Sequence, residues 1–332
     1  MPENPSPAPL RAIAVVGAGA VGSWFGGRLS LAGQRVTLIG RAAHVQAVQR
    51  QGLQLLRAGG SVTVHPSATT ELAGVQGADL VLVCVKCGDT EEVARALAPL
   101  LDDDALVLSL QNGVENVDTL ARHLRQTVMP VVVYAATAMP APGVVQHFGG
   151  GEVVVGPAGA TSEAAERQLQ AVAELFTGAG VAVRLSASVM TELWAKLVVN
   201  CACNAVSALA QSSYAQMAAL PAVLALQQAV VHEAVAVARA EGFALSTHTL
   251  LAAVARIATT MPGQRSSMAQ DLARGRRTEI QHLNGHVVRR GAALGIVTPV
   301  NQALTALVQL AETAGPAATA NVASSAEVTA RR

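Results

Sequence analysis

The sequence predicts an α/β fold, with a doubly wound sheet in the N-terminal half and an all-α domain in the C-terminal half. Three observations predict it. A glycine-rich turn joins an apolar β run to a helical pattern near the start of the chain. Strands of buried character then alternate with helices up to about residue 187, the arrangement typical of a parallel sheet. Beyond Val189 the β signal stops and long helical patterns follow.

Length and composition support two globular domains and argue against several other classes of protein. The chain has 332 residues, more than one average domain needs, and 51% of them are hydrophobic while only 2% are aromatic. A core built from these residues must consist mainly of Ala, Val and Leu. The formal net charge of +1 provides no global attraction to nucleic acid or to an anionic membrane surface.

The domain boundaries follow from changes in pattern along the chain. Residues 1–10 are Pro-rich and lack the basic region of a signal peptide, so we expect a disordered tail and a cytoplasmic protein. A nucleotide-binding domain is expected over residues 11–187 and a helical domain over residues 188–314. Residues 315–332 are small and polar, and we expect them to fray.

The first strand, in "RAIAVV", leads into a turn with GxGxxG spacing. Gly17 permits the tight turn, Gly19 lets the backbone approach a pyrophosphate, and Gly22 lets the helix pack against the strand. Free amides at the helix N-terminus attract the phosphates. The alternative is a tight turn without a ligand. The predicted cofactor-binding loop consists of Gly17, Ala18, Gly19, Ala20, Val21 and Gly22.

The second strand, "QRVTLIGR", ends at a position that discriminates between nicotinamide cofactors. In an NAD site a carboxylate near this end holds the ribose 2′-hydroxyl. No Asp or Glu occurs from Ala12 through Thr70, and Arg41 occupies the place instead. A guanidinium suits a 2′-phosphate, so NADP(H) is favoured over NAD(H). The alternative for Arg41 is a solvated surface arginine.

The next segments extend the sheet. "LQLLR" and "SVTVH" flank Gly59-Gly60 and read as a hairpin. "ADLVLVCVK" and "ALVLSLQNG" are buried strands that end at Lys86 and Asn112, with "VMPVVVYAATAM" as a further strand. Ligands of parallel sheets bind beyond the carboxyl ends of the strands, so Lys86 and Asn112 are candidate site residues. The alternatives are a surface lysine and an Asn-Gly turn.

The last part of this domain and the start of the next contain weaker signals. "GVVQHFGGGEVVVG" indicates a hairpin or edge strands, a helix follows in "SEAAERQLQAVAELFTGAG", and "VAVRLS" is a last short strand. In the helical half, Thr298-Pro299 is typical of an N-cap followed by Pro at the first helical position. The pairs Cys84/Cys87 and Cys201/Cys203 are expected to be free, buried thiols rather than redox or metal sites.

The helix expected in "KLVVNCACN" contains three polar side chains at intervals of four residues. Lys196, Asn200 and Asn204 drift by only ~40° per step, so they form one stripe on the helix. Together with Glu192 they also argue against a bilayer-spanning helix. Polar groups in an apolar setting cost a few kcal/mol each unless they find partners, and a wet cleft supplies them. The alternative is a narrow exposed face on a mostly buried helix.

A second polar cluster lies in "QRSSMAQDLARGRRTEIQHLNG". Ser267 followed by Gln270 fits a capping box, and its alternative role is an anion contact at that helix N-terminus. Glu279 is expected to open the next helix. Glu279, His282 and His286 would then share a face at i, i+3 and i+7, but no further metal ligand is evident, so no metal is expected.

Four segments together resemble the ketopantoate reductase family: "GAGAVG", "QNGVEN", "ELWAKLVVNCACN" and "SSMAQDLARGRRTEIQHLNG". The resemblance spans about Ala12 to Glu312, and the last two motifs are its most specific part. It implies a Rossmann-type domain followed by a helical domain, with the active site in the cleft between. It also implies NADPH as hydride donor, a 2-oxo acid as acceptor, and a monomer or a homodimer.

The resemblance also implies roles for individual residues. Lys196 matches the catalytic lysine, which holds the developing alkoxide and then protonates it. Glu279 matches the acidic residue at the cofactor and substrate, and it either orients Lys196 or accepts from a substrate hydroxyl. Asn112 matches the asparagine beside the nicotinamide and the substrate. The other matched positions are substrate contacts at Asn200, Asn204 and Ser267, and cofactor contacts at Lys86 and Arg41.

The leading hypothesis from this resemblance is NADPH-dependent reduction of ketopantoate to pantoate, on the route to pantothenate and coenzyme A. Three competing functions remain open at this point. The first keeps the mechanism but reduces another branched or aromatic 2-oxo acid in place of ketopantoate. The second is a regulator that senses NADP(H) without turnover, which predicts loss of the lysine that the chain retains at Lys196. The third is a β-hydroxyacid dehydrogenase, against which the segment from Ser266 to Ile280 argues.

Overall fold

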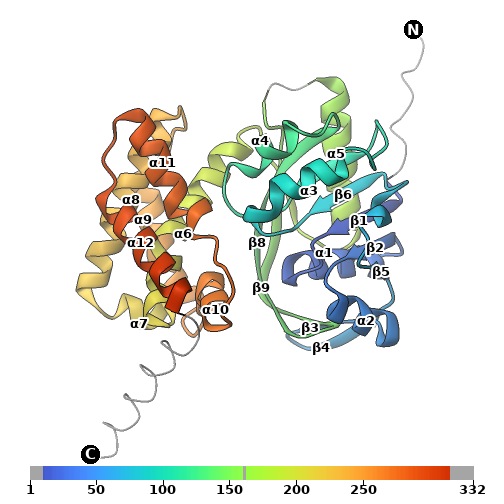
Figure 1. Cartoon of the computed structure of the whole chain (residues 1–332), viewed down its shortest axis with the longest axis horizontal. Helices are drawn as coiled ribbons and strands as arrows, with labels where there is room; N and C mark the ends of the chain where they lie inside the picture. Colours follow the sequence, from blue (N-terminus) through green and yellow to red (C-terminus); the bar gives the residue numbers. More distant parts are fainter. Residues whose placement is uncertain (1–9, 160–161, 315–332) are drawn as a thin grey trace, which may run out of the picture. The chain divides into compact units, whose positions relative to one another are not determined.

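The computed structural model of the chain describes residues 10–159 and 162–314 (Figure 1). The tails expected at residues 1–10 and 315–332 lie outside these ranges, apart from Leu10. The chain divides into two compact units, Met1–Glu192 and Leu193–Arg332. Each unit is described by itself below.

Six neighbouring strands of the N-terminal unit form a parallel sheet in the order β5-β2-β1-β6-β7-β8. This order confirms the predicted doubly wound sheet, in which the chain starts near the middle and builds outward to both sides. The strands are β1 (Ala12–Val16), β2 (Arg35–Ile39), β5 (Ser67–Thr69), β6 (Leu80–Val83), β7 (Leu106–Ser109) and β8 (Thr127–Ala141). The helices of the unit are α1 (Ala20–Leu31), α2 (Ala42–Gln51), α3 (Thr90–Leu97), α4 (Asn116–Ala121) and α5 (Glu163–Gly178), and two 3₁₀ turns are η1 (Leu72–Val75) and η2 (Cys87–Asp89).

Beyond β8 the sheet becomes mixed, in the region where the sequence indicated hairpins or edge strands. β8 pairs antiparallel with β9 (Val144–Val155), because only two residues separate them and so short a connection cannot cross over to a parallel strand. β3 (Leu53–Arg57) then pairs with β9, and β4 (Gly60–Val64) pairs antiparallel with β3, which confirms the predicted hairpin. β10 (Val183–Leu185) also pairs with β9.

Alternate residues of the central strands enter two separate cores, one on each face of the sheet. Leu80 and Leu82 of β6 belong to the first core, whereas Val81 and Val83 belong to the second. The first core also contains most of the aromatic side chains of the unit. One of them is Trp24, whose indole stacks on the His147 ring at 4.3 Å. Burial on both faces explains why these strands read as continuous apolar runs.

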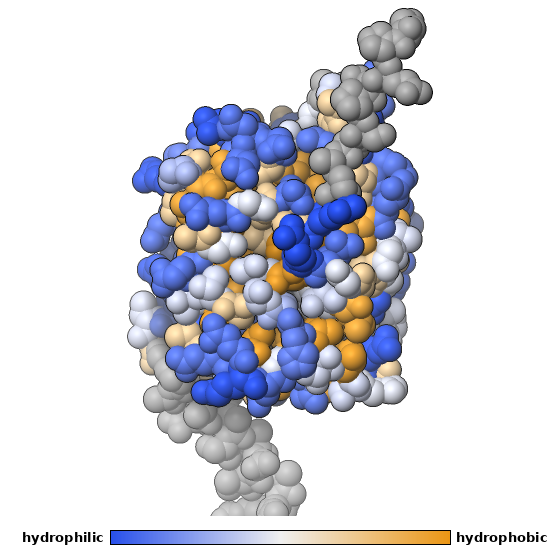
Figure 2. Space-filling view, turned by 90° about the vertical axis from the view of Figure 1, so that its right-hand side faces the viewer, coloured by the Kyte–Doolittle hydropathy of each residue, from blue (hydrophilic) through white to orange (hydrophobic). Residues whose placement is uncertain are grey.

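One face of the molecule shows how its polar and apolar side chains are distributed. Over the face shown in Figure 2, hydrophobic side chains lie in small groups between hydrophilic ones, as is usual for a folded surface (Figure 2).

The helical unit contains the helices that the second half of the sequence predicts. Pro221 and Pro299 each occupy the first helical position of their helices, as expected from their fixed φ. The helices are α6 (Val189–Ala210, whose first turn belongs to the N-terminal unit), α7 (Tyr214–Ala218), α8 (Pro221–Ala240), α9 (Thr247–Thr260), α10 (Ser267–Ala273), α11 (Asn284–Leu294) and α12 (Pro299–Ala314), with the 3₁₀ turn η3 (Ile280–His282).

By length and composition alone, two of these helices are long and apolar enough to cross a membrane. The apolar window of α6 is 67% buried inside the structure, and that of α8 is 39% buried. Burial in the core of the helical unit accounts for the apolar composition of α6, in which Leu197, Val198 and Cys201 are at most 1% exposed.

Candidate active site

The glycine loop has the geometry that a dinucleotide requires. Gly17 adopts a φ of +97°, and a Cβ atom placed there would lie 2.6 Å from the backbone N of Val85. A Cβ on Gly22 would lie 2.9 Å from the Val15 side chain and still closer to the Gly17 carbonyl. Gly19 differs, since a Cβ there would meet nothing nearer than 4.0 Å. The fold therefore needs glycine at 17 and 22, whereas Gly19 leaves open space before the N-terminus of α1, which fits a pyrophosphate.

Two buried side chains that the sequence did not single out support this loop. The Ser23 hydroxyl donates to the Ala18 carbonyl at 3.2 Å and lies 3.0 Å from His44 Nε2. The backbone N–H of Gly143 donates to His44 Nδ1 at 3.0 Å, so the ring proton resides on Nε2 and points to Ser23. Burial lowers the pKa of His44, which keeps the ring neutral and this arrangement intact.

Arg41 lies where the sequence places it, beside the glycine loop. It is the N-cap residue of α2, directly after the carboxyl end of β2, and its side chain is exposed. Its neighbour Gly40 packs so closely on the loop that an added Cβ would lie 2.9 Å from the Ala18 Cβ. Arg41 is thus a candidate cofactor-binding residue at the edge of the glycine loop.

Lys86 and Asn112 follow two adjacent parallel strands, β6 and β7, at their carboxyl ends. Lys86 is exposed and lies at the N-cap position of η2, whereas Asn112 is partly buried. Their loops are in direct contact, because the Cys87 thiol donates to the Asn112 carbonyl at 3.0 Å. The structure therefore brings these two predicted residues to the same edge of the sheet as the glycine loop.

In the helical unit, Lys196, Asn200 and Asn204 all lie on α6, as the predicted stripe requires. Lys196 and Asn200 are partly buried, and Asn204 is 5% exposed. The backbone carbonyl of Asn204 accepts a hydrogen bond from the Ser266 hydroxyl at 3.2 Å, which ties this turn of α6 to the start of α10.

The prediction that Ser267 caps α10 is wrong by one residue. The N-cap is Ser266, which is buried and whose hydroxyl accepts from the Ala269 N–H at 3.0 Å. Helix α6 fixes Ser266, because the Ser266 backbone N–H donates to the Ser207 hydroxyl of that helix. Ser267 is instead the first residue of the helix, with an exposed side chain that capping does not use.

The prediction that Glu279 opens an α-helix is also wrong. Glu279 precedes the 3₁₀ turn η3, and Leu283 then breaks the chain direction with φ −111° and ψ −101° before α11 starts. Glu279, His282 and His286 therefore do not share one helix face. Within residues 10–159 and 162–314, no group of three or more His, Cys, Asp or Glu side chains is placed to hold a metal ion. The Glu279 side chain is 7% exposed.

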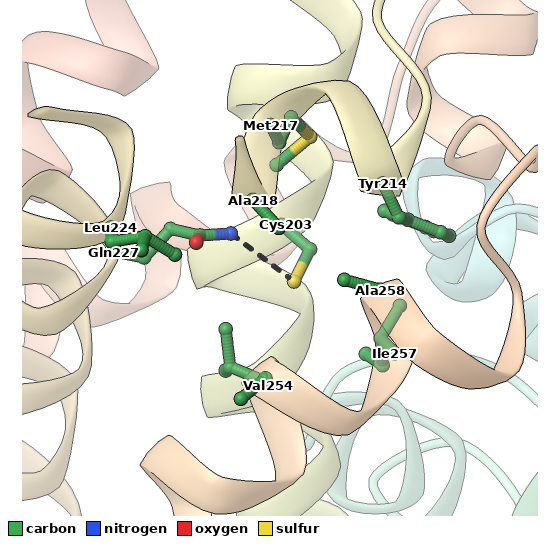
Figure 3. Close-up of a pocket in the computed structure, with 10 residues that line it drawn as sticks. Cys203, Tyr214, Met217, Ala218, Leu224, Gln227, Val254, Ile257 and Ala258 are labelled. Atoms are coloured by element: carbon green, nitrogen blue, oxygen red, sulfur yellow. Dashed lines mark hydrogen bonds between the residues drawn. The ribbon is translucent and has the colours of Figure 1, made fainter. Parts of the chain in front are cut away.

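A small pocket in the helical unit does not involve the candidate residues (Figure 3). Cys203, Tyr214, Met217 and Gln227 are among its lining residues, and the Gln227 amide donates to the Cys203 sulfur at 3.8 Å. The centre of a water molecule can move through a volume of about 20 Å³ in this pocket, so the pocket holds about one water molecule. This pocket is too small for a 2-oxo acid.

The four cysteines are free thiols, as predicted. Burial raises the pKa of Cys203 to about 12, and burial with the nearby Cys203 raises that of Cys201 as well. Both therefore stay protonated at neutral pH and behave as small apolar side chains.

A doubly wound sheet with an open glycine loop, followed by an all-α unit with a lysine and asparagine stripe, defines a two-domain oxidoreductase of the nicotinamide-dependent class. The chain belongs to the ketopantoate reductase family. The family model described as ketopantoate reductase PanE/ApbA matches residues 13–160, and the model of its C-terminal part matches residues 188–312.

Individual relatives support this assignment over nearly the whole chain. The 2-dehydropantoate 2-reductase of Halobacterium salinarum is 37% identical over 306 residues, which cover 91% of this chain and 99% of the relative. A PanE/ApbA family ketopantoate reductase from Ralstonia eutropha JMP134 is 50% identical, with a TM-score of 0.85 and coverage of 91% and 98%. D-mandelate dehydrogenase, solved with NADH and anilino(oxo)acetate, is 28% identical, with a TM-score of 0.83 and coverage of 91% and 98%.

Proposed function

We propose that the chain reduces 2-dehydropantoate to pantoate with NADPH, a step of pantothenate and coenzyme A biosynthesis. One observation carries the proposal. The chain matches the ketopantoate reductase family in both units and has Lys196, Asn200 and Asn204 at intervals of four residues on a single, mostly apolar helix. We expect a cytoplasmic enzyme that is a monomer or a homodimer.

Lys196 is assigned to the reacting carbonyl oxygen. Bound NADPH supplies a hydride to the carbonyl carbon of the oxo acid, which places negative charge on that oxygen. The Lys196 ammonium stabilises this charge more in the transition state than in the ground state. It then transfers one proton to the oxygen, which completes the hydroxyl group, and regains a proton from solvent.

The neighbouring polar side chains are assigned to holding the substrate. Asn200 and Asn204 donate hydrogen bonds to its carboxylate or hydroxyl without adding charge. Ser267 has an exposed hydroxyl that is not engaged in capping, which supports its assignment to the carboxylate. Asn112 contacts the nicotinamide and substrate. Glu279 either orients Lys196 or accepts a hydrogen bond from a substrate hydroxyl. The activity of Glu279→Gln, measured with a substrate that lacks this hydroxyl, distinguishes the two roles.

The N-terminal unit is assigned to the cofactor, with NADPH preferred over NADH. The open space at Gly19 suits the pyrophosphate, and the exposed guanidinium of Arg41 suits the 2′-phosphate. Lys86 adds a further positive charge at the same edge of the sheet. No carboxylate lies between Ala12 and Thr70 to select the 2′-hydroxyl of NADH.

A second candidate function keeps the mechanism and changes the oxo acid. The similarity to D-mandelate dehydrogenase favours it, because that enzyme has the same architecture. Steady-state oxidation of NADPH, measured with 2-dehydropantoate, phenylglyoxylate and 3-methyl-2-oxobutanoate, tests both. A kcat/KM for 2-dehydropantoate at least tenfold above the others supports the first proposal, and a higher value for phenylglyoxylate supports the second.

A further inference from the structure

A chain of buried hydrogen bonds connects the two loops that carry Lys86 and Asn112, and the proposed reaction gives its members no role. The loops leave adjacent parallel strands, β6 and β7. The polar side chains between them are all between 1% and 5% exposed: Cys87, Thr90, Ser109, Gln111 and Asn116. Polar groups persist in such a place only when they are paired.

The chain of bonds runs in one direction. Gln111 Nε2 donates to the Val85 carbonyl at 3.1 Å and to the Thr90 hydroxyl at 2.7 Å. The Thr90 hydroxyl donates its single proton to Asn116 Oδ1 at 2.9 Å, and Asn116 Nδ2 donates to the Asn112 carbonyl at 2.6 Å. The carbonyls of Val85 and Asn112 can only accept, so each faces the nitrogen of its amide partner, and the orientation of both amides is fixed.

The same carbonyl of Asn112 receives a second hydrogen bond from the other loop. The donor is the thiol of Cys87, the residue directly after Lys86, at 3.0 Å. At the opposite end of the chain of bonds, the Ser109 hydroxyl donates to Gln111 Oε1 at 3.1 Å. These hydrogen bonds thus hold the first loop at the residues on either side of Lys86. They hold the second loop at Asn112 and at the residue before it.

We propose that Thr90, Gln111 and Asn116 are positioning residues, which hold Asn112 and the Lys86 loop in the geometry that hydride transfer requires. The inference rests on the proposed function, in which Asn112 contacts the nicotinamide and substrate. Thr90 is the central member, because its hydroxyl accepts from the Gln111 amide and donates to the Asn116 amide. A small displacement of a contacting group costs rate even when the displaced group itself is intact.

A matched pair of substitutions at Thr90 tests the proposal. Thr90→Val keeps the side-chain shape and removes the hydroxyl, so both bonds of Thr90 are lost. We expect kcat with 2-dehydropantoate to fall about tenfold, while the Kd for NADPH stays within about twofold. Thr90→Ser keeps the hydroxyl and is expected to retain kcat within about twofold. Equal losses in the two variants would show that the methyl group matters and would overturn the proposal.

A control substitution in the same unit distinguishes the positioning role of Thr90 from a purely structural role. Gln126 is also buried, and its amide donates to the carbonyls of Leu101 and Asp102, in a turn that carries none of the candidate residues. Gln126→Met is expected to lower the Tm about as much as Thr90→Val and to leave kcat unchanged. A kcat that falls with the Tm in both variants would overturn the positioning role.

A double substitution distinguishes failure of this inference from failure of the proposed function. If Thr90 acts through Asn112, adding Thr90→Val to Asn112→Ala changes kcat no further. Full activity in Asn112→Ala would refute the proposed role of Asn112 itself. Lost activity in Asn112→Ala with full activity in Thr90→Val would refute only the positioning role. Should Thr90→Val fail to fold, Gln111→Met breaks the same chain of bonds at its other end and has the same expected outcome.

Discussion

Substitution of Gly19 by alanine separates the needs of the fold from the needs of the cofactor. In the structure, a Cβ on Gly19 meets nothing within 4.0 Å, and its φ of −79° is accessible to alanine. The substitution also restricts the unfolded chain, so the free energy of unfolding is expected to rise by ~0.5 kcal/mol or stay unchanged. The new methyl group occupies the space through which a pyrophosphate approaches the amides of α1.

The expected loss of cofactor affinity follows from the bonds that the methyl group displaces. One hydrogen bond from a backbone N–H to a charged phosphate contributes about 1.5–3 kcal/mol. Its loss corresponds to an increase of about 10- to 150-fold in the Kd for NADPH. Isothermal titration of the folded variant with NADPH measures this increase, and thermal unfolding checks that the fold is intact.

Gly17→Ala is the matched control for this experiment. Alanine at φ +97°, with its Cβ 2.6 Å from the Val85 nitrogen, is expected to destabilise the fold by at least ~1–3 kcal/mol. If Gly19→Ala binds NADPH with the wild-type Kd, the loop is only a tight turn, and the assignment of the pyrophosphate site is refuted.

Three further predictions concern the other candidate residues. Lys196→Ala should lower kcat by about 10²–10³-fold with the Kd for NADPH within about twofold, and wild-type turnover would remove Lys196 from the mechanism. Arg41→Ala should raise KM for NADPH about tenfold and leave KM for NADH unchanged, whereas Arg35→Ala at the other end of β2 should change neither. Burial lowers the folded-state pKa of His44 below its ordinary value of 6.5, so the folded protein resists protonation there. Its contribution to stability is complete above about pH 6.5 and is lost as pH falls through the lowered pKa. The urea midpoint should therefore fall less between about pH 7.5 and about pH 5.5 in His44→Gln than in the wild type, and equal decreases would contradict this account.

Much of the N-terminal fold was predictable because its signals are local. The strand before Gly17 and the buried strands that end near Lys86 and Asn112 were predicted correctly from the sequence, because both faces of these strands are apolar. The antiparallel extension was not predictable in the same way. "GVVQHFGGGEVVVG" alternates poorly, and the three bulges or irregularities between β8 and β9 interrupt the period of two on which strand recognition depends.

In the helical unit, the stripe on α6 was predictable from spacing alone, whereas the details around Ser266 and Glu279 were not. Either serine of "SS" satisfies the sequence pattern of a cap, and the choice of Ser266 depends on its bonds to Ser207 and Asn204, which are distant in sequence. The change of chain direction at Leu283 does not occur at a glycine or proline, so the sequence does not indicate it. The hydrogen bonds that link Thr90 to Asn116 likewise depend on tertiary pairing of two strands, so no local signal identifies them.

The two tryptophans of the chain, both buried, fall one in each unit. Trp24 lies in α1, stacked on His147, and Trp194 lies in α6 against Phe243 and His286. Replacing either by phenylalanine leaves a single indole emitter. The wavelength of its fluorescence emission maximum, followed during thermal unfolding, then reports whether that half of the chain unfolds alone or together with the other. No label needs to be attached to the protein.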